Sequence, residues 1–271
     1  MDAIEALRAL EPAFVEAGKL ALKMQQGVRA YNKFETGNPV ADVVTKADLA
    51  VQEYLLQAIS KTQLTECKLF AEEDTPLTSL FSGESPLYLA IDPIDGTAAY
   101  SKGRDNFSTI ISLHDGHRML YTFVYFPAWD WAHVMENSRY SERGKTPNLV
   151  YPEDLKKKIA FWSGDPEKML PKDVLDRLGE CGISFTTVKN HSGSFATIES
   201  FATNAIAGVY RENTNAYDGL VEMAMAQAKG RKVFSGGPNG RFDLSDIRKR
   251  ETGFYYPGYY LALNDALSAE I

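Results

Sequence analysis

The sequence predicts a mixed fold whose first half is α+β, built on an antiparallel sheet, and whose second half is α/β. Two helix patterns open the chain, short apolar strand patterns follow as far as residue 136, and strand and helix patterns then alternate to the end. The segment 137–154 is polar and contains Gly144, Pro147 and Pro152. Because these residues favour loops, we expect the chain to divide there into domains 1–150 and 151–271.

The two helix patterns precede residue 62. In residues 3–28, apolar side chains recur with helical spacing, at Ile4, Leu7, Leu10, Phe14, Ala17 and Ala21. A polar loop through residues 37–39 leads to a second amphipathic helix, from Leu49 to about Lys61. The residues just before it, Thr45-Lys46-Ala47-Asp48, match a capping box, so we expect Thr45 and Asp48 at the start of this helix.

Strand patterns dominate the middle of the chain. They cover residues 67–71, 87–91, 107–113, 119–126 and 131–136, and Asp115-Gly116 is a good hairpin turn. Strand and helix patterns then alternate at 159–162, 167–178, 183–188, 194–203, 205–210, 216–229 and 232–234. A last strand at 258–264 and a short terminal helix complete the prediction.

The most informative motif is Asp92-Pro93-Ile94-Asp95-Gly96-Thr97, which follows an apolar strand pattern. Pro93 has no amide to continue the strand's hydrogen bonds, so we expect Asp92 and Asp95 on a tight, exposed turn. Gly96 permits close backbone approach, and its amide and that of Thr97 can face an anion. Carboxylates beside such amides suit magnesium and a phosphate ester, whereas the alternative is a solvated turn.

Acidic residues also follow two other elements. Glu72-Glu73-Asp74 come directly after the strand pattern 67–71, and Asp218 lies near the first turn of the helix pattern 216–229. Alone, acidic residues in either position are more often solvent-exposed surface residues or helix caps. Combined with the first motif, they favour a metal site.

Four segments together resemble the signatures of the inositol monophosphatase family, in the family's order and with similar spacing. They are Asp42 to Asp48, Ala71-Glu72-Glu73, Asp92 to Thr97 and Tyr217-Asp218. Members of the wider superfamily hydrolyse phosphate monoesters of inositol, sugars, histidinol or adenosine bisphosphates with magnesium, and many are inhibited by lithium. The resemblance implies a layered α-β-α-β-α sandwich and two or three Mg²⁺ ions.

The resemblance also implies the metal ligands. Glu72, Asp92 and the carbonyl of Ile94 are expected to hold one ion. Asp92 is expected to bridge to a second ion that Asp95 and Asp218 hold. Two cations can stabilise the attacking and leaving oxygens of an in-line displacement.

Catalytic and supporting roles follow from the same resemblance. Glu72 and Thr97 are expected to position and help deprotonate the attacking water, with Glu73 and a third, loosely held ion. The amides of Gly96 and Thr97 are expected to receive the phosphate. Asp48, with Thr45 contacting it, is expected near the metals, and this role is compatible with helix capping.

The chain departs from the family where the family contacts substrate. Tyr217 replaces a usual tryptophan, and Arg211 stands where inositol-specific members carry a glutamate that grips a substrate hydroxyl. A guanidinium there suits a second anionic group or another polar handle. Ser192 is expected on the substrate side, and helix capping is its alternative role. These departures argue against myo-inositol 1-phosphate as the substrate.

Composition limits the classes of protein to consider. The 271 residues are 44% hydrophobic and 24% charged, as in an ordinary globular enzyme. The net charge of −7 argues against a general nucleic-acid surface. The two cysteines are too few for a disulfide framework, and neither a secretory pattern nor a membrane-length apolar run is seen. We therefore expect a cytoplasmic protein that does not bind membranes. The resemblance to the family, whose members are commonly dimers, implies a homodimer.

We expect magnesium-dependent hydrolysis of a small phosphorylated metabolite, such as a polyol, sugar or amino-alcohol phosphate. One alternative is a phosphatase for 3′-phosphoadenosine nucleotides, which would need a base-binding pocket. Another is a regulatory protein that uses the same fold to bind a macromolecular partner. Retention of every presumed metal position favours the enzyme.

Overall fold

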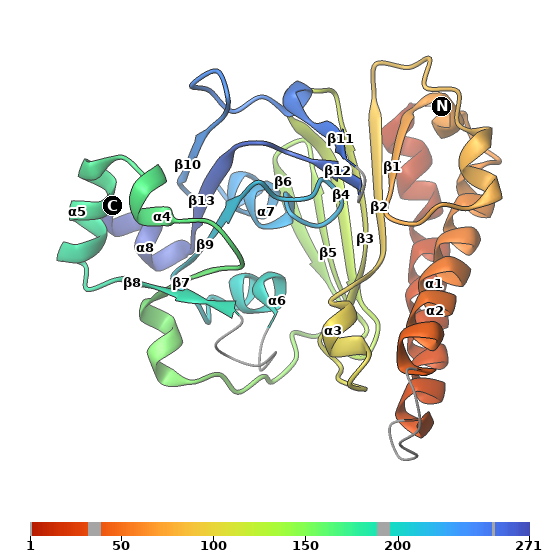
Figure 1. Cartoon of the computed structure of the whole chain (residues 1–271), viewed down its shortest axis with the longest axis horizontal. Helices are drawn as coiled ribbons and strands as arrows, with labels where there is room; N and C mark the ends of the chain where they lie inside the picture. Colours follow the sequence, from red (N-terminus) through yellow and green to blue (C-terminus); the bar gives the residue numbers. More distant parts are fainter. Residues whose placement is uncertain (1, 32–38, 189–195, 251–252) are drawn as a thin grey trace. The chain divides into compact units, whose positions relative to one another are not determined.

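The computed structural model describes residues 2–31, 39–188, 196–250 and 253–271. The chain forms two compact units, and each is described by itself (Figure 1). Unit 1 comprises Met1–Glu136 and Ser141–Pro147, and unit 2 comprises Asn137–Tyr140 and Asn148–Ile271. Within the described residues, none of the helices has both the length and the apolar character needed to span a bilayer.

Unit 1 begins with two long helices that lie side by side, α1 (Ala3–Tyr31) and α2 (Pro39–Ile59) (Figure 1). The expected capping box is wrong, because α2 starts at Pro39 and its interior contains both Thr45 and Asp48. Proline suits the first position of a helix, where its fixed φ fits and its missing amide costs nothing. Asp48 is buried there, so its surroundings are set by packing rather than by a helix terminus.

Unit 1 also contains a six-stranded sheet in the order β1-β2-β3-β4-β5-β6, of which the first two residues of β6 are assigned to unit 2. Its strands are β1 (Lys68–Ala71), β2 (Tyr88–Asp95), β3 (Ser108–His114), β4 (Met119–Phe126), β5 (Trp131–Glu136) and β6 (Arg139–Arg143). β1 and β2 are parallel, and β2 to β5 pair in antiparallel fashion. The hairpin predicted at Asp115-Gly116 is confirmed, with the Asp115 amide donating to Arg118 O. β6 lies in the segment that the sequence marked as a polar boundary.

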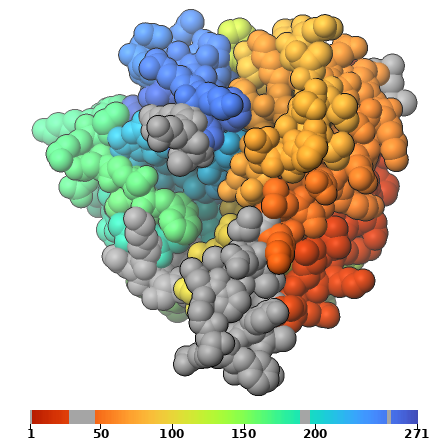
Figure 2. Space-filling view, turned by 45° about the vertical axis from the view of Figure 1, so that its right-hand side comes forward, coloured from red at the N-terminus to blue at the C-terminus, as the bar shows by residue number. Residues whose placement is uncertain are grey.

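The core of unit 1 joins α1 and α2 to one face of this sheet. Alternate residues along the strands point toward the helices, as the period of two requires. Phe14 of α1 packs on Phe123 of β4, with ring centroids 5.6 Å apart. Tyr100, in the short helix α3 (Thr97–Tyr100), is fully buried and donates its hydroxyl hydrogen bond to Ala21 O in α1, at 2.8 Å. Figure 2 shows residues 46–95, from the second half of α2 to the end of β2, as an orange-to-yellow part of the surface.

Unit 2 contains a five-stranded mixed sheet, in the order β10-β13-β9-β7-β8. Its strands are β7 (Lys158–Phe161), β8 (Ser184–Thr187), β9 (Gly208–Glu212), β10 (Val233–Gly236) and β13 (Tyr259–Leu263). β7 is parallel to both β8 and β9, whereas β13 is antiparallel to β9 and β10. A separate hairpin joins β11 (Arg248–Arg250) and β12 (Gly253–Tyr255), which the sequence did not predict.

Helices cover both faces of the unit 2 sheet. They are α4 (Pro166–Met169), α5 (Lys172–Glu180), α6 (Thr197–Ala202), α7 (Val221–Ala228) and α8 (Asp265–Glu270). Side chains of α5 and α8 form one core with Ile159, Tyr210 and Leu261, whereas α6 and α7 pack together and contact β9 and β13. The predicted fold class is confirmed, with a mostly antiparallel first half and an α/β second half.

Candidate active site

The Asp92 to Thr97 motif continues strand β2 further than expected. The prediction of an exposed turn at Asp92 and Asp95 is wrong, because Asp92 is only 4% exposed and the strand continues to Asp95. Asp92 pairs with Ile110 of β3, and Asp95 pairs with Ser108, so β2 has one more residue than β3 between these pairs. Pro93 is tolerated because this bulge needs no amide from it.

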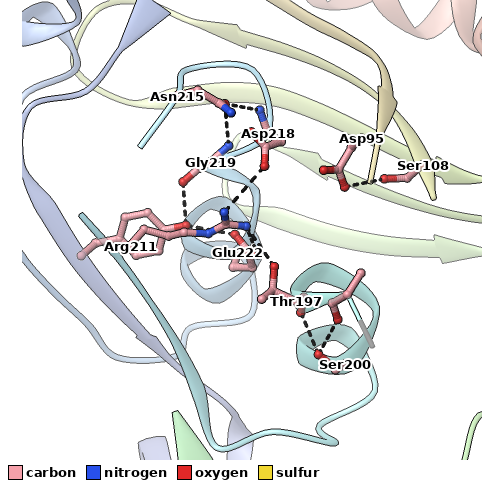
Figure 3. Close-up of polar contacts among 11 residues, drawn as sticks. Asp95, Ser108, Thr197, Ser200, Arg211, Asn215, Asp218, Gly219 and Glu222 are labelled. Carbon is pink, nitrogen blue, oxygen red and sulfur yellow. Dashed lines mark hydrogen bonds and ion pairs between the residues drawn. The ribbon is translucent and has the colours of Figure 1, made fainter. Parts of the chain in front are cut away.

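Side chains of β3 fix the bulge. Thr109 Oγ1 donates a hydrogen bond of 2.9 Å to Pro93 O, and Ser108 Oγ donates one of 3.1 Å to Asp95 Oδ2 (Figure 3). The sequence analysis missed Ser108, although its place at the start of a strand after the motif was a usable signal. The hydrogen bond orients Asp95, which is partly exposed.

Gly96 makes the sharp connection from β2 to α3. Its φ of +86° lies in the left-handed region, which side chains disfavour, and a Cβ there would lie 3.1 Å from Asn106 O. The exposed Thr97 side chain donates from Oγ1 to Ile94 O at 3.3 Å. Thus the carbonyl expected to bind metal and the hydroxyl expected to orient water contact each other.

Strand register brings the second acidic segment to the first. Ala71 of β1 pairs with Ile91 of β2, and the Glu72 amide donates to Ile91 O at 3.2 Å. Because β1 and β2 are parallel, their carboxyl ends lie at the same edge of the sheet. Glu72 and Asp92 therefore share that edge, although they are twenty residues apart in sequence.

Helix α2 supports the same edge through Gln52, which the sequence analysis missed. Its Nε2 donates to Glu73 O at 2.6 Å and its Oε1 accepts from the Glu73 amide at 3.0 Å. Gln52 is fully buried, one helical turn after Asp48. A glutamine beside the apolar residues Val51 and Leu55 was the available sequence signal.

Asp48, Glu72, Glu73, Asp92 and Asp95 are called the acidic edge below. Asp48 is 4% exposed, and burial, then the charges of Glu72 and Glu73, raise its pKa to about 8. Burial also raises the pKa of Glu73. Burial is the larger cause of both shifts, and for Asp48 the repulsion from Glu72 and Glu73 adds to it, which a bound cation would relieve.

The acidic edge offers only oxygen donors, which are the ligands that Mg²⁺ prefers. Within the described ranges, however, no three His, Cys, Asp or Glu side chains stand close enough together to hold a metal ion as they are. The residues fit Mg²⁺ in chemical type and charge, and a closed set of ligands requires some side-chain movement.

In unit 2, a loop held by Asn215 presents Asp218. Asn215 Oδ1 accepts from the amides of Tyr217, Asp218 and Gly219, at 3.0, 3.1 and 3.4 Å (Figure 3). A Cβ on Gly219 would lie 1.9 Å from Thr214 Oγ1, so this close turn requires glycine. Helix α7 starts later than predicted, because these Asn215 contacts form a turn and Asp218 precedes Val221 by three residues.

Arg211 of β9 lies at the centre of a buried group (Figure 3). Its Nη2 is 2.7 Å from Glu222 Oε1 and donates to Thr197 Oγ1 at 2.9 Å, while its Nη1 is 3.7 Å from Asp218 Oδ2. The Tyr260 hydroxyl donates to Gly219 O at 2.8 Å and to Glu222 Oε2 at 3.0 Å. We call Thr197, Arg211, Asp218, Glu222 and Tyr260 the arginine cluster.

Opposing effects act on Asp218. Burial raises its pKa, Arg211 opposes the rise, and Glu222 adds to it. The two nearby carboxylates raise the pKa of Arg211 above its usual value despite burial, so the guanidinium stays charged. In the part of the chain that the structure describes, no donor reaches the buried Oδ1 of Asp218. An unpartnered buried carboxylate oxygen is costly, and a cation would satisfy it.

Two predicted residues lie outside what can be described. Ser192 falls in 189–195, and the side chain of Thr45 is likewise not described. Helix α6 begins after Ala196, whose amide donates to the Glu199 carboxylate at 2.9 Å.

Sequence comparison adds one match. The profile of the inositol monophosphatase family matches residues 5–163. A search of curated proteins finds no significant match.

Solved structures of similar fold cover nearly the whole chain. Inositol monophosphatase II from Staphylococcus aureus is 16% identical, with a TM-score of 0.61 over 98% of this chain and 94% of that chain. CysQ from Bacteroides thetaiotaomicron is 16% identical, with a TM-score of 0.59 over 96% and 97%. Extragenic suppressor protein SuhB from Bartonella henselae is 16% identical, with a TM-score of 0.59 over 100% and 98%. At these identities the likeness shows a shared fold.

Proposed function

The chain belongs to the inositol monophosphatase family and is a phosphomonoesterase, and from this premise we propose that it hydrolyses a small phosphate monoester with magnesium. The observation that carries the proposal is the shared sheet edge of Glu72 and Asp92, where burial, and then the charges of Glu72 and Glu73, raise the pKa of Asp48. Clustered carboxylates that repel one another are suited to divalent cations.

Three ligands supplied by unit 1 hold the first ion in this proposal: Glu72, Asp92 and the carbonyl of Ile94. Asp92 would also help to hold a second ion, together with Asp95 and Asp218. The support for Asp218 is its buried Oδ1, which lacks a donor among the described residues. When bound, the ions lower the pKa of water and offset the charge on the transferring phosphoryl group.

The chain's own groups then orient the reaction. Glu72 accepts a proton from the attacking water, and Thr97, whose hydroxyl is already anchored by Ile94 O, positions that water. Glu73 supports a third, weakly bound ion, and its backbone is fixed by Gln52. The amides of Gly96 and Thr97 receive phosphate oxygens, because the positive φ of Gly96 allows close approach.

For the substrate we propose a polyol, sugar or amino-alcohol phosphate rather than myo-inositol 1-phosphate. The reason is Arg211, which occupies the position of the family's hydroxyl-gripping glutamate. Arg211 and Ser192 remain the predicted substrate contacts. The protein is further proposed to be a cytoplasmic homodimer that does not bind nucleic acid or membranes.

An assay against a panel of phosphate esters, with Mg²⁺ and with a chelator, tests the proposal. We expect turnover that requires Mg²⁺, and Asp95→Asn and Asp218→Asn should each lower kcat/KM by about 100-fold or more, since supporting residues alone typically cost 10- to 100-fold. The matched control is Asp74→Asn, which removes an exposed charge from the same acidic run.

Three outcomes separate the alternatives. Preferred turnover of 3′-phosphoadenosine esters would identify a nucleotidase. Absence of turnover on every ester, with Mg²⁺ bound, would favour a regulatory binding protein. Equal loss in Asp74→Asn and Asp95→Asn would refute the ligand assignment.

A further inference from the structure

The two oxygens of the Asp218 carboxylate have different contacts within the arginine cluster. Asp218 is 8% exposed, and only its Oδ2 faces Arg211 Nη1, at 3.7 Å (Figure 3). Its other oxygen, Oδ1, is buried and has no donor among the described residues. The two oxygens thus have different surroundings, with a cationic side chain near Oδ2 and no hydrogen-bond donor at Oδ1 among the described residues.

The shorter contact of Arg211 is to Glu222, not to Asp218. Glu222 Oε1 is 2.7 Å from Nη2, and Glu222 is fully buried. Tyr260 fixes the other oxygen of Glu222 at 3.0 Å, and Thr197 accepts from the same Nη2 at 2.9 Å. Arg211 is therefore held by groups other than Asp218.

The charges of the cluster follow from these contacts. Glu222 compensates the positive charge of the Arg211 guanidinium, so the negative charge of Asp218 is not compensated within the cluster. If Glu222 were absent, Arg211 would neutralise Asp218 and oppose binding of any cation to it.

We propose that Arg211 is a positioning residue that fixes Asp218 through Oδ2 and leaves Oδ1 for a divalent cation, and that Glu222 keeps Arg211 from neutralising that carboxylate. This inference rests on the proposed function, because it assigns Asp218 as a metal ligand. This role replaces the substrate contact expected of Arg211 above, because the two Nη atoms of its guanidinium contact Thr197, Asp218 and Glu222.

Calorimetric titration of the full-length protein with Mg²⁺ alone, without substrate, tests the proposal. Glu222→Gln should weaken binding about tenfold or more, the lower end of what supporting residues contribute. The double variant Arg211→Met/Glu222→Leu removes one positive and one negative charge, so its net charge is unchanged. Weaker Mg²⁺ binding by this variant therefore reports lost positioning rather than lost charge.

The matched control is Arg231→Met/Asp265→Asn, which removes another ion pair of unit 2, with 2.7 Å between Arg231 Nε and Asp265 Oδ1. This variant should bind Mg²⁺ as the unaltered protein does. Circular dichroism of each variant verifies folding, and the double variant keeps the test open if Glu222→Gln fails to fold.

The outcomes separate this inference from the proposed function. If Asp218→Asn and the unaltered protein bind Mg²⁺ equally, the metal role of Asp218 is wrong and the inference falls with it. If Asp218→Asn weakens binding but the double variant does not, the inference alone is overturned. A raised KM at saturating Mg²⁺, with unchanged Mg²⁺ affinity, would instead make Arg211 a substrate contact.

Discussion

The acidic edge of unit 1 and the arginine cluster of unit 2 solve the same electrostatic problem in opposite ways. In the acidic edge, Asp48 is buried beside other carboxylates, and its pKa rises to about 8. In the arginine cluster, two buried carboxylates share one guanidinium. The acidic edge consists of carboxylates alone, whereas the arginine cluster includes the guanidinium of Arg211.

This difference means that similar substitutions should have opposite effects on stability. Removing one of several mutually repelling carboxylates stabilises the folded state. Removing one partner of a buried ion pair leaves an uncompensated charge, which destabilises the folded state. The free energy of unfolding of metal-free protein can therefore distinguish the two regions without any assay of activity.

The largest change is expected for Arg211→Met, which should lower the free energy of unfolding by about 3–5 kcal/mol, because it leaves the buried carboxylates of Asp218 and Glu222 without their guanidinium. The double variant Arg211→Met/Glu222→Leu should recover part of this loss, because only the Asp218 carboxylate is then left without a cation. Urea denaturation measures both, and a double variant as unstable as the single one would contradict the comparison.

In protein treated with a chelator, Asp48→Asn should raise the free energy of unfolding by about 3 kcal/mol at pH 6, because the pKa of Asp48 is about 8 in the folded state and ordinarily 3.8. The folded state binds the proton of Asp48 more tightly than the unfolded state does. Burial of Asp48 therefore costs more stability as pH rises from about 4 to 8. Asparagine does not ionise, so the two proteins should converge near pH 4. Urea denaturation at pH 4, 6 and 8 measures the gap, and a constant gap would contradict the assignment.

His114, in β3 of unit 1, should show the opposite pH dependence. Burial lowers the pKa of this 1% exposed ring to about 4, and only Asp115 opposes the shift. The unfolded state binds more protons between pH 4 and 6.5, so about 3 kcal/mol of stability is lost as pH falls through that range. His114→Gln should remove this loss. Unchanged acid sensitivity in denaturation experiments would count against it.

The smallest effect is expected for Ser108→Ala, which removes the 3.1 Å hydrogen bond to Asp95 but no ligand. A drop of about tenfold in kcat/KM is expected, since Ser108 fixes the orientation of the proposed ligand Asp95. Ser112→Ala is the matched control, because Ser112 is also buried on β3 but contacts Thr122. Equal effects of the two substitutions on kcat/KM would contradict the proposal that Ser108 orients Asp95.

Several features were predictable from local sequence. Helical spacing located α1, apolar runs located β1 to β5, and Asp115-Gly116 located a hairpin. The end of β2 was not predictable in the same way. Pro93 normally interrupts a strand, but a bulge stabilised by Thr109 of the neighbouring strand accommodates it.

The capping box shows a different limit. Thr45 and Asp48 have the spacing of a helix start, yet Pro39 begins the helix earlier. A local motif indicates what a segment can form, and packing of α2 against α1 and the sheet selected the longer helix.

The sequence by itself determined the secondary structure of most segments, the order of the four acidic segments and therefore the family. These properties depend on residues close together along the chain. Only the tertiary structure decided what contacts these acidic segments and Arg211: Gln52 at the backbone of Glu73, Ser108 at the carboxylate of Asp95, and Glu222 at the guanidinium of Arg211. Burial and counter-charge come from residues on other elements, so no local pattern specifies them.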